Sequence, residues 1–201
     1  MKALSQHVRW ILLLFWLAIA ACQNKTDASR EPLQVVTYSM FQKFVKETGY
    51  VTEAERFGWS IVQNDVFGFT KVEGANWRTP DGKNKPKSGE LPVTQVSFID
   101  AQRYCEWSGS RLPTYEEYWQ LVELDEREVI SNGNGGIAKA NKVNVLGNVW
   151  EITSSMHNGR VRLAGGSWFC STHTCNGTIM ERELYVDCQT GNVHIGFAVV
   201  K

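Results

Sequence analysis

An apolar run near the N-terminus sets both the size and the compartment of whatever this chain folds into. Residues 10–19 are apolar without interruption, Lys2 and Arg9 precede them, and two alanines follow. A positive start, an apolar stretch too short to span a bilayer as a helix, and small residues at its end are the marks of a secretory signal peptide. We therefore expect residues 1–21 to be removed on export, which leaves about 180 residues for the folded body.

The signal ends in a motif that resembles the bacterial lipobox. Residues 19–22 are Ile-Ala-Ala-Cys, and in lipoproteins the cysteine takes a diacylglyceryl group and becomes the new N-terminus. We expect Cys22 to carry a lipid anchor, residues 22–34 to form a flexible tether, and the exported protein to be membrane-anchored on the periplasmic side. Gln23 is not the aspartate that commonly retains lipoproteins at the inner membrane, which favours the outer membrane. An ordinary secretory signal, with a cysteine there by chance, is the alternative.

The remaining body has the size and charge of one globular domain that does not bind nucleic acid. About 180 residues can bury a sizeable core, and we expect residues 35–201 to form a single domain. The whole chain carries 21 Lys and Arg against 21 Asp and Glu. Loss of Lys2 and Arg9 with the leader makes the mature protein slightly acidic, so it has no electrostatic footprint for nucleic acid. We expect no nucleic-acid partner.

Local signals predict short helices among strands and loops. Capping boxes, in which a hydroxyl and a side chain three residues later satisfy backbone N–H groups, occur at residues 39–42, 97–100 and 114–117. Apolar side chains follow each box at helical spacing, so we expect three helices to begin there. Runs rich in β-forming residues at 93–96 and 197–200 predict strands. Eight tryptophans supply buried area where regular structure is sparse, and the mixture indicates an α+β fold.

Four cysteines remain in the body, in a compartment that permits disulfides. They are Cys105, Cys170, Cys175 and Cys188. Four cysteines allow three complete pairings, among which the sequence does not choose. On spacing alone, the Cys-x4-Cys pair formed by Cys170 and Cys175 favours a structural disulfide or a redox dithiol over a metal site.

A series of segments spread over the body points to a known family. They are residues 41–58 (FQKFVKETGYVTEAERFG), 74–82 (GANWRTPDG), 92–97 (PVTQVS), 104–109 (YCEWSG), 111–114 (RLPT), 147–151 (GNVWE), 165–168 (GGSW) and 194–197 (HIGF). Together and in this order, they resemble the formylglycine-generating enzyme (sulfatase-modifying factor) family from residue 35 to the C-terminus. The resemblance implies a single-domain α+β fold that is related to C-type lectins and low in regular secondary structure.

The resemblance gives the Cys170 and Cys175 pair a chemical role. Residues 165–175 (GGSWFCSTHTC) have the spacing Gly-Gly-Ser-aromatic-x-Cys-x4-Cys of the active oxidases. By this resemblance Cys170 and Cys175 bind one Cu(I), the ion that soft thiolates select, while Ser167 and Trp150 shape the oxygen pocket beside it. The implied activity is a copper-dependent oxidation that converts a cysteine of a client protein, such as a sulfatase, to formylglycine. We expect a protein or peptide substrate that presents a target cysteine.

A second function stays open on the same residues. In an oxidising compartment Cys170 and Cys175 are equally suited to a metal-free disulfide, in a non-catalytic binding or assembly lipoprotein that keeps the fold for recognition. If they hold copper instead, Cys105 and Cys188 are left as the natural disulfide pair, and a buried free thiol at Cys105 is the alternative.

The resemblance also implies a structural calcium site at residues 144–151. Hard Ca²⁺ prefers carboxylate, amide and carbonyl oxygens close together, and this stretch offers all three. The implied ligands are the Asn144 side chain, the carbonyls of Gly147 and Val149, and Glu151. Without the resemblance, the stretch would be interpreted as a plain turn.

Overall fold

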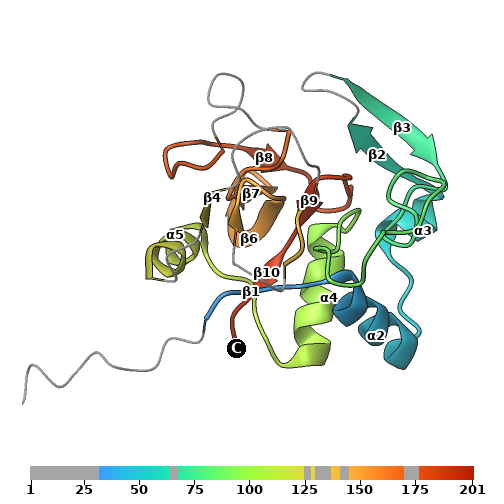
Figure 1. The fold of residues 1–201 in the computed structure, drawn as a ribbon, viewed down its shortest axis with the longest axis horizontal. Coiled ribbons are helices and arrows are strands. Elements are labelled where there is room, and N and C mark those ends of the chain that lie inside the picture. The colour runs from blue at the N-terminus through green and yellow to red at the C-terminus, as the bar shows by residue number, and fades with distance from the viewer. Residues whose placement is uncertain (1–31, 64–67, 125–127, 130–136, 141–144, 170–176) are drawn as a thin grey trace, which may run out of the picture. The chain divides into compact units, whose positions relative to one another are not determined.

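Short helices and short strands joined by loops make up this protein (Figure 1). The structure, a computed structural model, describes residues 32–63, 68–124, 128–129, 137–140, 145–169 and 177–201. Its described helices have five to eleven residues and its described strands two to eight. Pro32–Lys201 form one compact unit. The fold is α+β with a modest amount of regular secondary structure, as the sequence predicts.

Helix α4 (Phe98–Ser108) begins at the cap that the sequence predicts. The Ser97 hydroxyl accepts the Asp100 N–H at 3.2 Å, and the Asp100 carboxylate accepts the Ser97 N–H at 2.8 Å. This reciprocal cap satisfies N–H groups that the first turn of a helix leaves unbonded. The helix ends at Gly109, whose left-handed φ of 66° closes the last turn.

Helix α2 (Tyr38–Thr48) begins earlier than the sequence predicts. Its N-cap is Thr37, whose hydroxyl accepts a first-turn N–H at 3.3 Å, so Ser39 lies inside the helix. Thr37 is extended and forms a bridge with Pro92, and an extended residue with a hydroxyl is a good N-cap. The cap predicted at residues 39–42 is therefore wrong, although the helix is present.

A short helix, α3 (Glu53–Phe57), follows in a region where the sequence analysis expected none. Thr52 and Glu55 form its capping box: the Thr52 hydroxyl accepts the Glu55 N–H at 3.3 Å, and the Glu55 carboxylate accepts the Thr52 N–H at 3.0 Å. The T-x-x-E pattern was a local signal for this helix. The pattern does not predict a helix by apolar spacing, because only one helical turn follows it.

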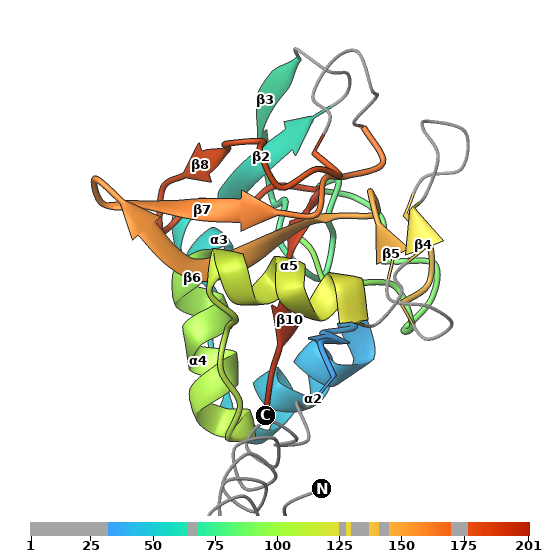
Figure 2. The same cartoon turned by 90° about the vertical axis from the view of Figure 1, so that its left-hand side faces the viewer.

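The largest sheet has the strand order β8-β7-β6-β9. Its members are β6 (Trp150–His157), β7 (Arg160–Ala164), β8 (Tyr185–Val186) and β9 (Ile195–Gly196). The first three are antiparallel neighbours, whereas β9 runs parallel to the start of β6. Helix α5 (Tyr115–Leu124), which begins after the predicted Thr114 cap, lies across β6 and β7 (Figure 2).

The other described strands form two-stranded pairs. They are β1 (Gln34–Val35) with β10 (Ala198–Val199), β2 (Trp59–Gln63) with β3 (Phe69–Glu73), and β4 (Glu128–Val129) with β5 (Val145–Leu146). Pairing of β1 with β10 joins the start of the compact unit to its end. The strand predicted at 197–200 is present as β10.

The run at residues 93–96 is not a strand, contrary to the prediction. Its N–H groups bond to separate segments, because Val93 donates to the Val36 carbonyl at 2.9 Å and Gln95 donates to the Asn192 carbonyl at 3.0 Å. Gln95 also has a φ of 60°, a left-handed conformation that turns the chain out of a strand. The β-forming side chains of this run are buried in the core instead.

Aromatic side chains dominate the larger hydrophobic core. The Phe41 ring of α2 lies 5.3 Å from the Trp77 ring, 6.1 Å from the Tyr104 ring and 6.3 Å from the Phe197 ring, measured between centroids. Phe41 and Trp77 have no exposed surface, and burying one such ring stabilises a fold by about 2–3 kcal/mol relative to leaving it in water. These rings come from four separate segments, so a few large side chains replace the packing that longer elements would give.

The two described cysteines are free thiols, so a Cys105 to Cys188 disulfide is not formed. Cys105 is buried on α4, as predicted, and its burial raises its pKa to about 11. Ile99, at the start of α4, donates its N–H to the Cys188 carbonyl at 3.3 Å. Ile99 precedes Cys105 by six residues, about 9 Å along the helix axis, which places the two cysteines too far apart for a disulfide.

Within the described residues, none of the helices has the length and apolarity that crossing a bilayer requires.

Candidate active site

Two described residues that flank Cys170 and Cys175 in the sequence touch each other. Both cysteines lie outside the described residues. Gly166 precedes the two cysteines and Gly177 follows them; a Cβ on Gly177 would come within 2.6 Å of the Gly166 Cα and would overlap the Trp150 indole. Only a glycine allows such a close approach. Gly166 and Gly177 are therefore held in contact, with Gly177 packed on Trp150.

Ser167 and His194 form a buried polar pair next to the contact between Gly166 and Gly177. The Ser167 Oγ lies 3.1 Å from Nδ1 of His194, and the two residues are 1% and 7% exposed. Burial lowers the pKa of His194 to about 4, so the imidazole is neutral at pH 7. A neutral imidazole offers Nδ1 as donor or acceptor according to its tautomer: Nδ1 accepts from the Ser167 hydroxyl in one tautomer and donates to the Ser167 oxygen in the other.

His194 also connects this pair to Trp150. The backbone N–H of Trp150 donates to the His194 carbonyl at 2.9 Å, at the point where β9 begins to pair with β6. Trp150 is 2% exposed and packs on Gly177. Two predicted site residues, Ser167 and Trp150, are thus brought together through His194, although they are far apart in the sequence.

Two aromatic residues follow Ser167 directly in the sequence, and one of them contacts His194. Trp168 and Phe169 stack with centroids 3.7 Å apart, and the Phe169 ring meets the His194 imidazole edge-on at 5.4 Å. Trp168 is fixed by its backbone N–H, which donates to the Asn148 carbonyl at 3.0 Å. Its indole N–H is buried with no hydrogen-bond partner in the described part of the chain.

The buried Gln95 is bonded to the residues that directly precede His194 in the chain. The Gln95 N–H donates to the Asn192 carbonyl at 3.0 Å. The Ser60 hydroxyl lies 2.5 Å from the Gln95 side-chain carbonyl and 2.9 Å from the Gly191 carbonyl, and the Gln95 amide donates to two further carbonyls at 3.0 and 2.6 Å. A left-handed backbone is strained for glutamine and persists where surrounding bonds over-determine it. This network fixes the residues that lead into His194.

The turn implied to bind calcium is described in part. Glu151 is buried at the start of β6, and its carboxylate accepts a short hydrogen bond from the Tyr118 hydroxyl. Gly147 and Val149 lie in the same buried turn, whereas Asn144 lies outside the described residues. One carboxylate and two backbone carbonyls are the hard oxygen donors that suit Ca²⁺. Among the described residues, no three His, Cys, Asp or Glu side chains gather as a metal site of another kind.

His194 is the residue that the sequence analysis missed. It stands in the segment 194–197 that carried the family resemblance, yet a single histidine before a short strand gives no local sign of a role. Its position beside Ser167 depends on the parallel pairing of β9 with β6, a contact between segments about 45 residues apart that local patterns do not reveal.

Comparisons with known proteins indicate the family of the chain. The sulfatase-modifying factor enzyme 1-like domain matches residues 33–121. A cattle (Bos taurus) protein named inactive C-alpha-formylglycine-generating enzyme 2 is 31% identical over 193 residues, covering 66% of this chain and 63% of the relative. The formylglycine-generating enzyme of Streptomyces coelicolor is 42% identical over 100 residues, covering 41% of this chain and 32% of the relative.

One solved structure resembles the fold as a whole. PvdO from Pseudomonas aeruginosa superposes with a TM-score of 0.59 at 12% identity, covering 83% of this chain and 77% of PvdO. At that identity the likeness concerns the fold alone. The chain spans less than two thirds of the length of the curated relatives it matches.

Proposed function

The chain belongs to the formylglycine-generating enzyme family, and from this premise we propose that it oxidises a cysteine of a client protein to formylglycine. The observation that carries the proposal is the arrangement around the cysteine segment. Gly166 and Gly177, which flank the two cysteines in the sequence, touch each other, and Gly177 packs on Trp150; Ser167 contacts Nδ1 of His194. A buried hydroxyl with a buried partner, three residues before the first of the two cysteines in the sequence, is more than a structural disulfide requires.

The proposed reaction breaks the Cβ–Sγ bond of the client cysteine. The carbon is oxidised to an aldehyde and the sulfur leaves as hydrogen sulfide. Dioxygen supplies the aldehyde oxygen and is otherwise reduced to water, with two protons, and with two electrons from an added thiol. Copper(I) held by Cys170 and Cys175 would supply the oxygen chemistry that no side chain of the chain provides.

The chain's own residues would position and shield the reacting groups. In this proposal Nδ1 of His194 carries the proton and donates to the Ser167 oxygen, and the Ser167 hydroxyl donates a hydrogen bond toward the reacting oxygen. The buried indole of Trp150 excludes water from one side. The neutral His194 keeps charge out of the site, since burial lowers its pKa to about 4. Glu151 and the carbonyls of Gly147 and Val149 would hold Ca²⁺ as a structural ion.

The location of the protein is also proposed. We propose that Cys22 anchors the exported chain to a membrane by a lipid, where oxygen and copper are accessible. A client met after export would present its cysteine as a protein or peptide segment.

A second candidate is a non-catalytic binding or assembly protein that keeps the fold. The match that extends over 193 residues is to a relative whose name calls it inactive. This candidate requires that Cys170 and Cys175 form a metal-free disulfide.

Metal analysis beside thiol counting separates the two. The full-length protein is reconstituted with Cu(I) under a thiol reductant, dialysed, and assayed for bound copper and reactive thiols. The oxidase proposal expects one copper per chain, lost in Cys170→Ser and kept in the control Cys188→Ser, whose thiol is free in the structure. A protein that binds no copper and reoxidises to one disulfide would favour the non-catalytic candidate.

A further inference from the structure

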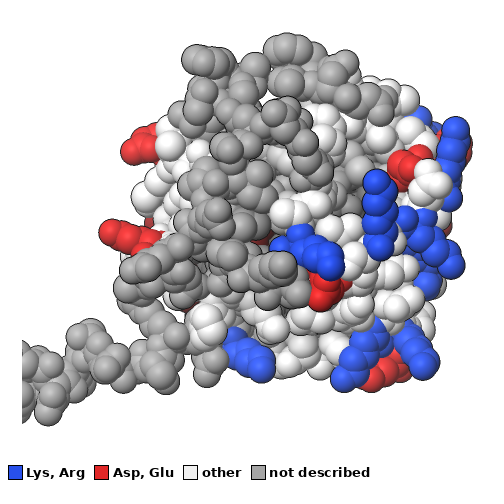
Figure 3. Space-filling view, in the orientation of Figure 1, with Lys and Arg blue, Asp and Glu red and all other residues white. Residues whose placement is uncertain are grey.

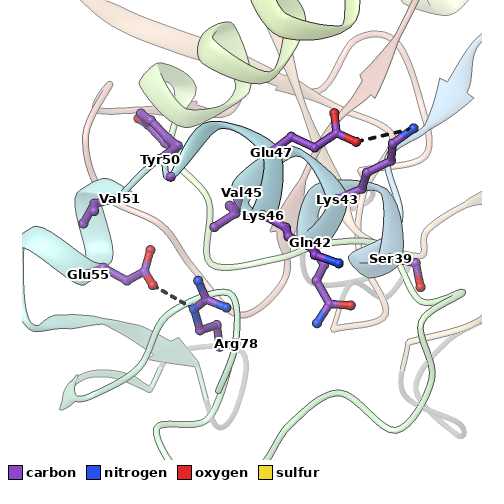
Figure 4. Close-up of a pocket in the computed structure, with 11 residues that line it drawn as sticks. Ser39, Gln42, Lys43, Val45, Lys46, Glu47, Tyr50, Val51, Glu55 and Arg78 are labelled. Carbon is purple, nitrogen blue, oxygen red and sulfur yellow. Dashed lines mark hydrogen bonds and ion pairs between the residues drawn. The ribbon is translucent and has the colours of Figure 1, made fainter.

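A pocket of about 850 Å³ lies between α2 and the loop that carries Arg78, away from the residues assigned to the oxidase site. Figure 4 shows α2 on one side and Arg78 on the other. A volume of this size holds a small molecule or a few residues of a peptide. The side chains that line the pocket decide which chemical groups would bind there.

Arg78 is held in a fixed orientation at the pocket. Its Nε donates to Glu55 at 3.0 Å, and its guanidinium lies 4.2 Å from the centroid of the Trp77 ring. Glu55 is itself held by Thr52 and by the Trp77 indole N–H at 3.2 Å. In the part of the chain that the structure describes, no hydrogen bond engages the two terminal nitrogens of Arg78. A guanidinium fixed through Nε, with both Nη groups available, is a ready fork for two oxygens of one anion.

Helix α2 adds two more donors on the opposite wall. Gln42 and Lys46 stand one helical turn apart and both line the pocket. Neither side chain has a hydrogen bond or ion pair among the described residues. The neighbouring Lys43 differs, because it pairs with Glu47 at 3.9 Å. Figure 4 shows Gln42 and Arg78 extending toward the same space.

The charge of the lining suits a monoanion. Three cations, Lys43, Lys46 and Arg78, and two carboxylates, Glu47 and Glu55, leave one positive charge. In the space-filling view, most of the visible lysines and arginines lie on the side of α2, α3 and β3 (Figure 3). A carboxylate matches both this charge and the planar Arg78 fork, whereas a phosphate dianion exceeds the charge.

The pocket also has an apolar part. Val51 is 47% exposed at its edge, and the half-buried Tyr50 ring lies beside it. The Tyr50 hydroxyl is already committed to Asp100 at 2.9 Å, so the ring offers mainly its apolar surface. A ligand would therefore combine a carboxylate with an apolar stem.

We propose that this pocket is a recognition site for a peptide carboxylate, with Arg78, Lys46 and Gln42 binding the carboxylate oxygens and with Tyr50 and Val51 contacting the neighbouring apolar side chain. An acidic residue flanked by apolar ones in a partner protein has this chemistry. The site is separate from the oxidase proposal and does not depend on it.

The test is a binding titration of the full-length protein in detergent, followed by the backbone amide signals of α2 and Arg78 in ¹H–¹⁵N spectra. The probes are the capped peptide acetyl-Leu-Glu-Leu-amide, its glutamine counterpart and inorganic phosphate. We expect saturable binding of the glutamate peptide with a Kd below about 1 mM. Lys46→Glu and Arg78→Gln should each weaken it at least about tenfold, because each removes a charged donor.

Lys85→Glu is the matched control, since it makes the same charge change at an exposed lysine outside the pocket. It should change the Kd by less than about twofold. Lys46 is exposed in the last turn of α2, so Lys46→Glu should lower the melting temperature by only a few degrees, and binding is compared at a temperature where both proteins are folded. The proposal is overturned if the glutamate and glutamine peptides bind equally, if phosphate binds and the peptide does not, or if Lys46→Glu and Lys85→Glu weaken binding alike.

Discussion

The Ser167 hydroxyl and Nδ1 of His194 lie 3.1 Å apart in a site that is almost closed to solvent. This contact joins the segment that precedes Cys170 to the start of β9, and through the His194 carbonyl it reaches Trp150. Three residues that are distant in the sequence thus form one buried unit. The following expectations test that unit, the caps that support the fold, and the chemistry proposed for it.

Protonation of His194 should destabilise the fold as the pH falls. Its pKa is about 4 in the folded protein and about 6.5 in an unfolded chain, so between these values the unfolded state binds more protons. Stability therefore rises with pH across this window and is lost as the pH falls from 6.5 toward 4. Urea unfolding should show a loss of about 2 kcal/mol between pH 7 and pH 5.

His194→Asn isolates this effect, because asparagine keeps a polar partner for Ser167 but does not titrate. The variant should lack that share of the pH dependence. Asp100 acts in the opposite direction, since its burial raises its pKa and makes its ionisation unfavourable to the fold, but it is present in both proteins. Parallel pH profiles for wild type and His194→Asn would contradict the assignment.

Asp100 should be among the more sensitive polar positions of the fold. One carboxylate oxygen accepts from the Tyr50 hydroxyl at 2.9 Å and the Glu53 N–H at 3.0 Å, and the other accepts from the Ser97 N–H and hydroxyl. Asp100→Asn replaces one acceptor by a donor, so we expect a loss of about 2 kcal/mol in urea unfolding at pH 7. Glu106→Gln, at an exposed site of the same helix, should cost less than about 0.5 kcal/mol.

Gly177→Ala should disturb the contacts of Gly177 with Trp150 and Gly166. A Cβ there would overlap the Trp150 ring and approach the Gly166 backbone, so the loss of stability should exceed about 2 kcal/mol. Gly159→Ala is the control: its φ of 72° strains alanine, but nothing lies within 4 Å. Its cost should stay near 1 kcal/mol. Equal losses of stability in the two variants would contradict a stabilising role for the contact of Gly177 with Trp150.

The sequence predicted the elements whose causes are local. The Ser97 and Asp100 box and the Thr114 cap mark helices that the structure has, since a cap depends on residues only three apart. The buried Cys105 likewise followed from helical spacing. The α2 cap was misplaced because two hydroxyl residues, Thr37 and Ser39, competed within three positions.

Non-local causes account for what the sequence did not predict. The run at 93–96 has strand composition, yet Gln95 bonds to Asn192 and turns the chain. Ser167 and Trp150 were named for the site by resemblance, whereas His194 was not, because its place depends on β9 pairing in parallel with β6. The ligands Cys170, Cys175 and Asn144 lie outside the described residues and stay predictions.

Calcium should stabilise the protein through the turn that ends at Glu151. If Glu151 and the carbonyls of Gly147 and Val149 hold Ca²⁺, a concentration about a hundredfold above the Kd adds about 3 kcal/mol. That corresponds to a rise of about 5–10 °C in the melting temperature, reversed by a chelator. Glu151→Gln should abolish the response, whereas Glu181→Gln, at an exposed site, should keep it. A wild-type melting temperature that calcium does not change would contradict a calcium site at this turn.

Turnover of a client cysteine tests the central claim most directly. The full-length protein, loaded with Cu(I) and supplied with oxygen and a thiol reductant, is incubated with a Cys-x-Pro-x-Arg peptide. Mass spectrometry should show a loss of about 18 Da, the conversion of the thiol side chain to an aldehyde. Activity should vanish in Cys170→Ser and persist in Cys188→Ser. No mass change with copper-loaded wild type, or equal conversion by Cys170→Ser, would contradict the oxidase assignment.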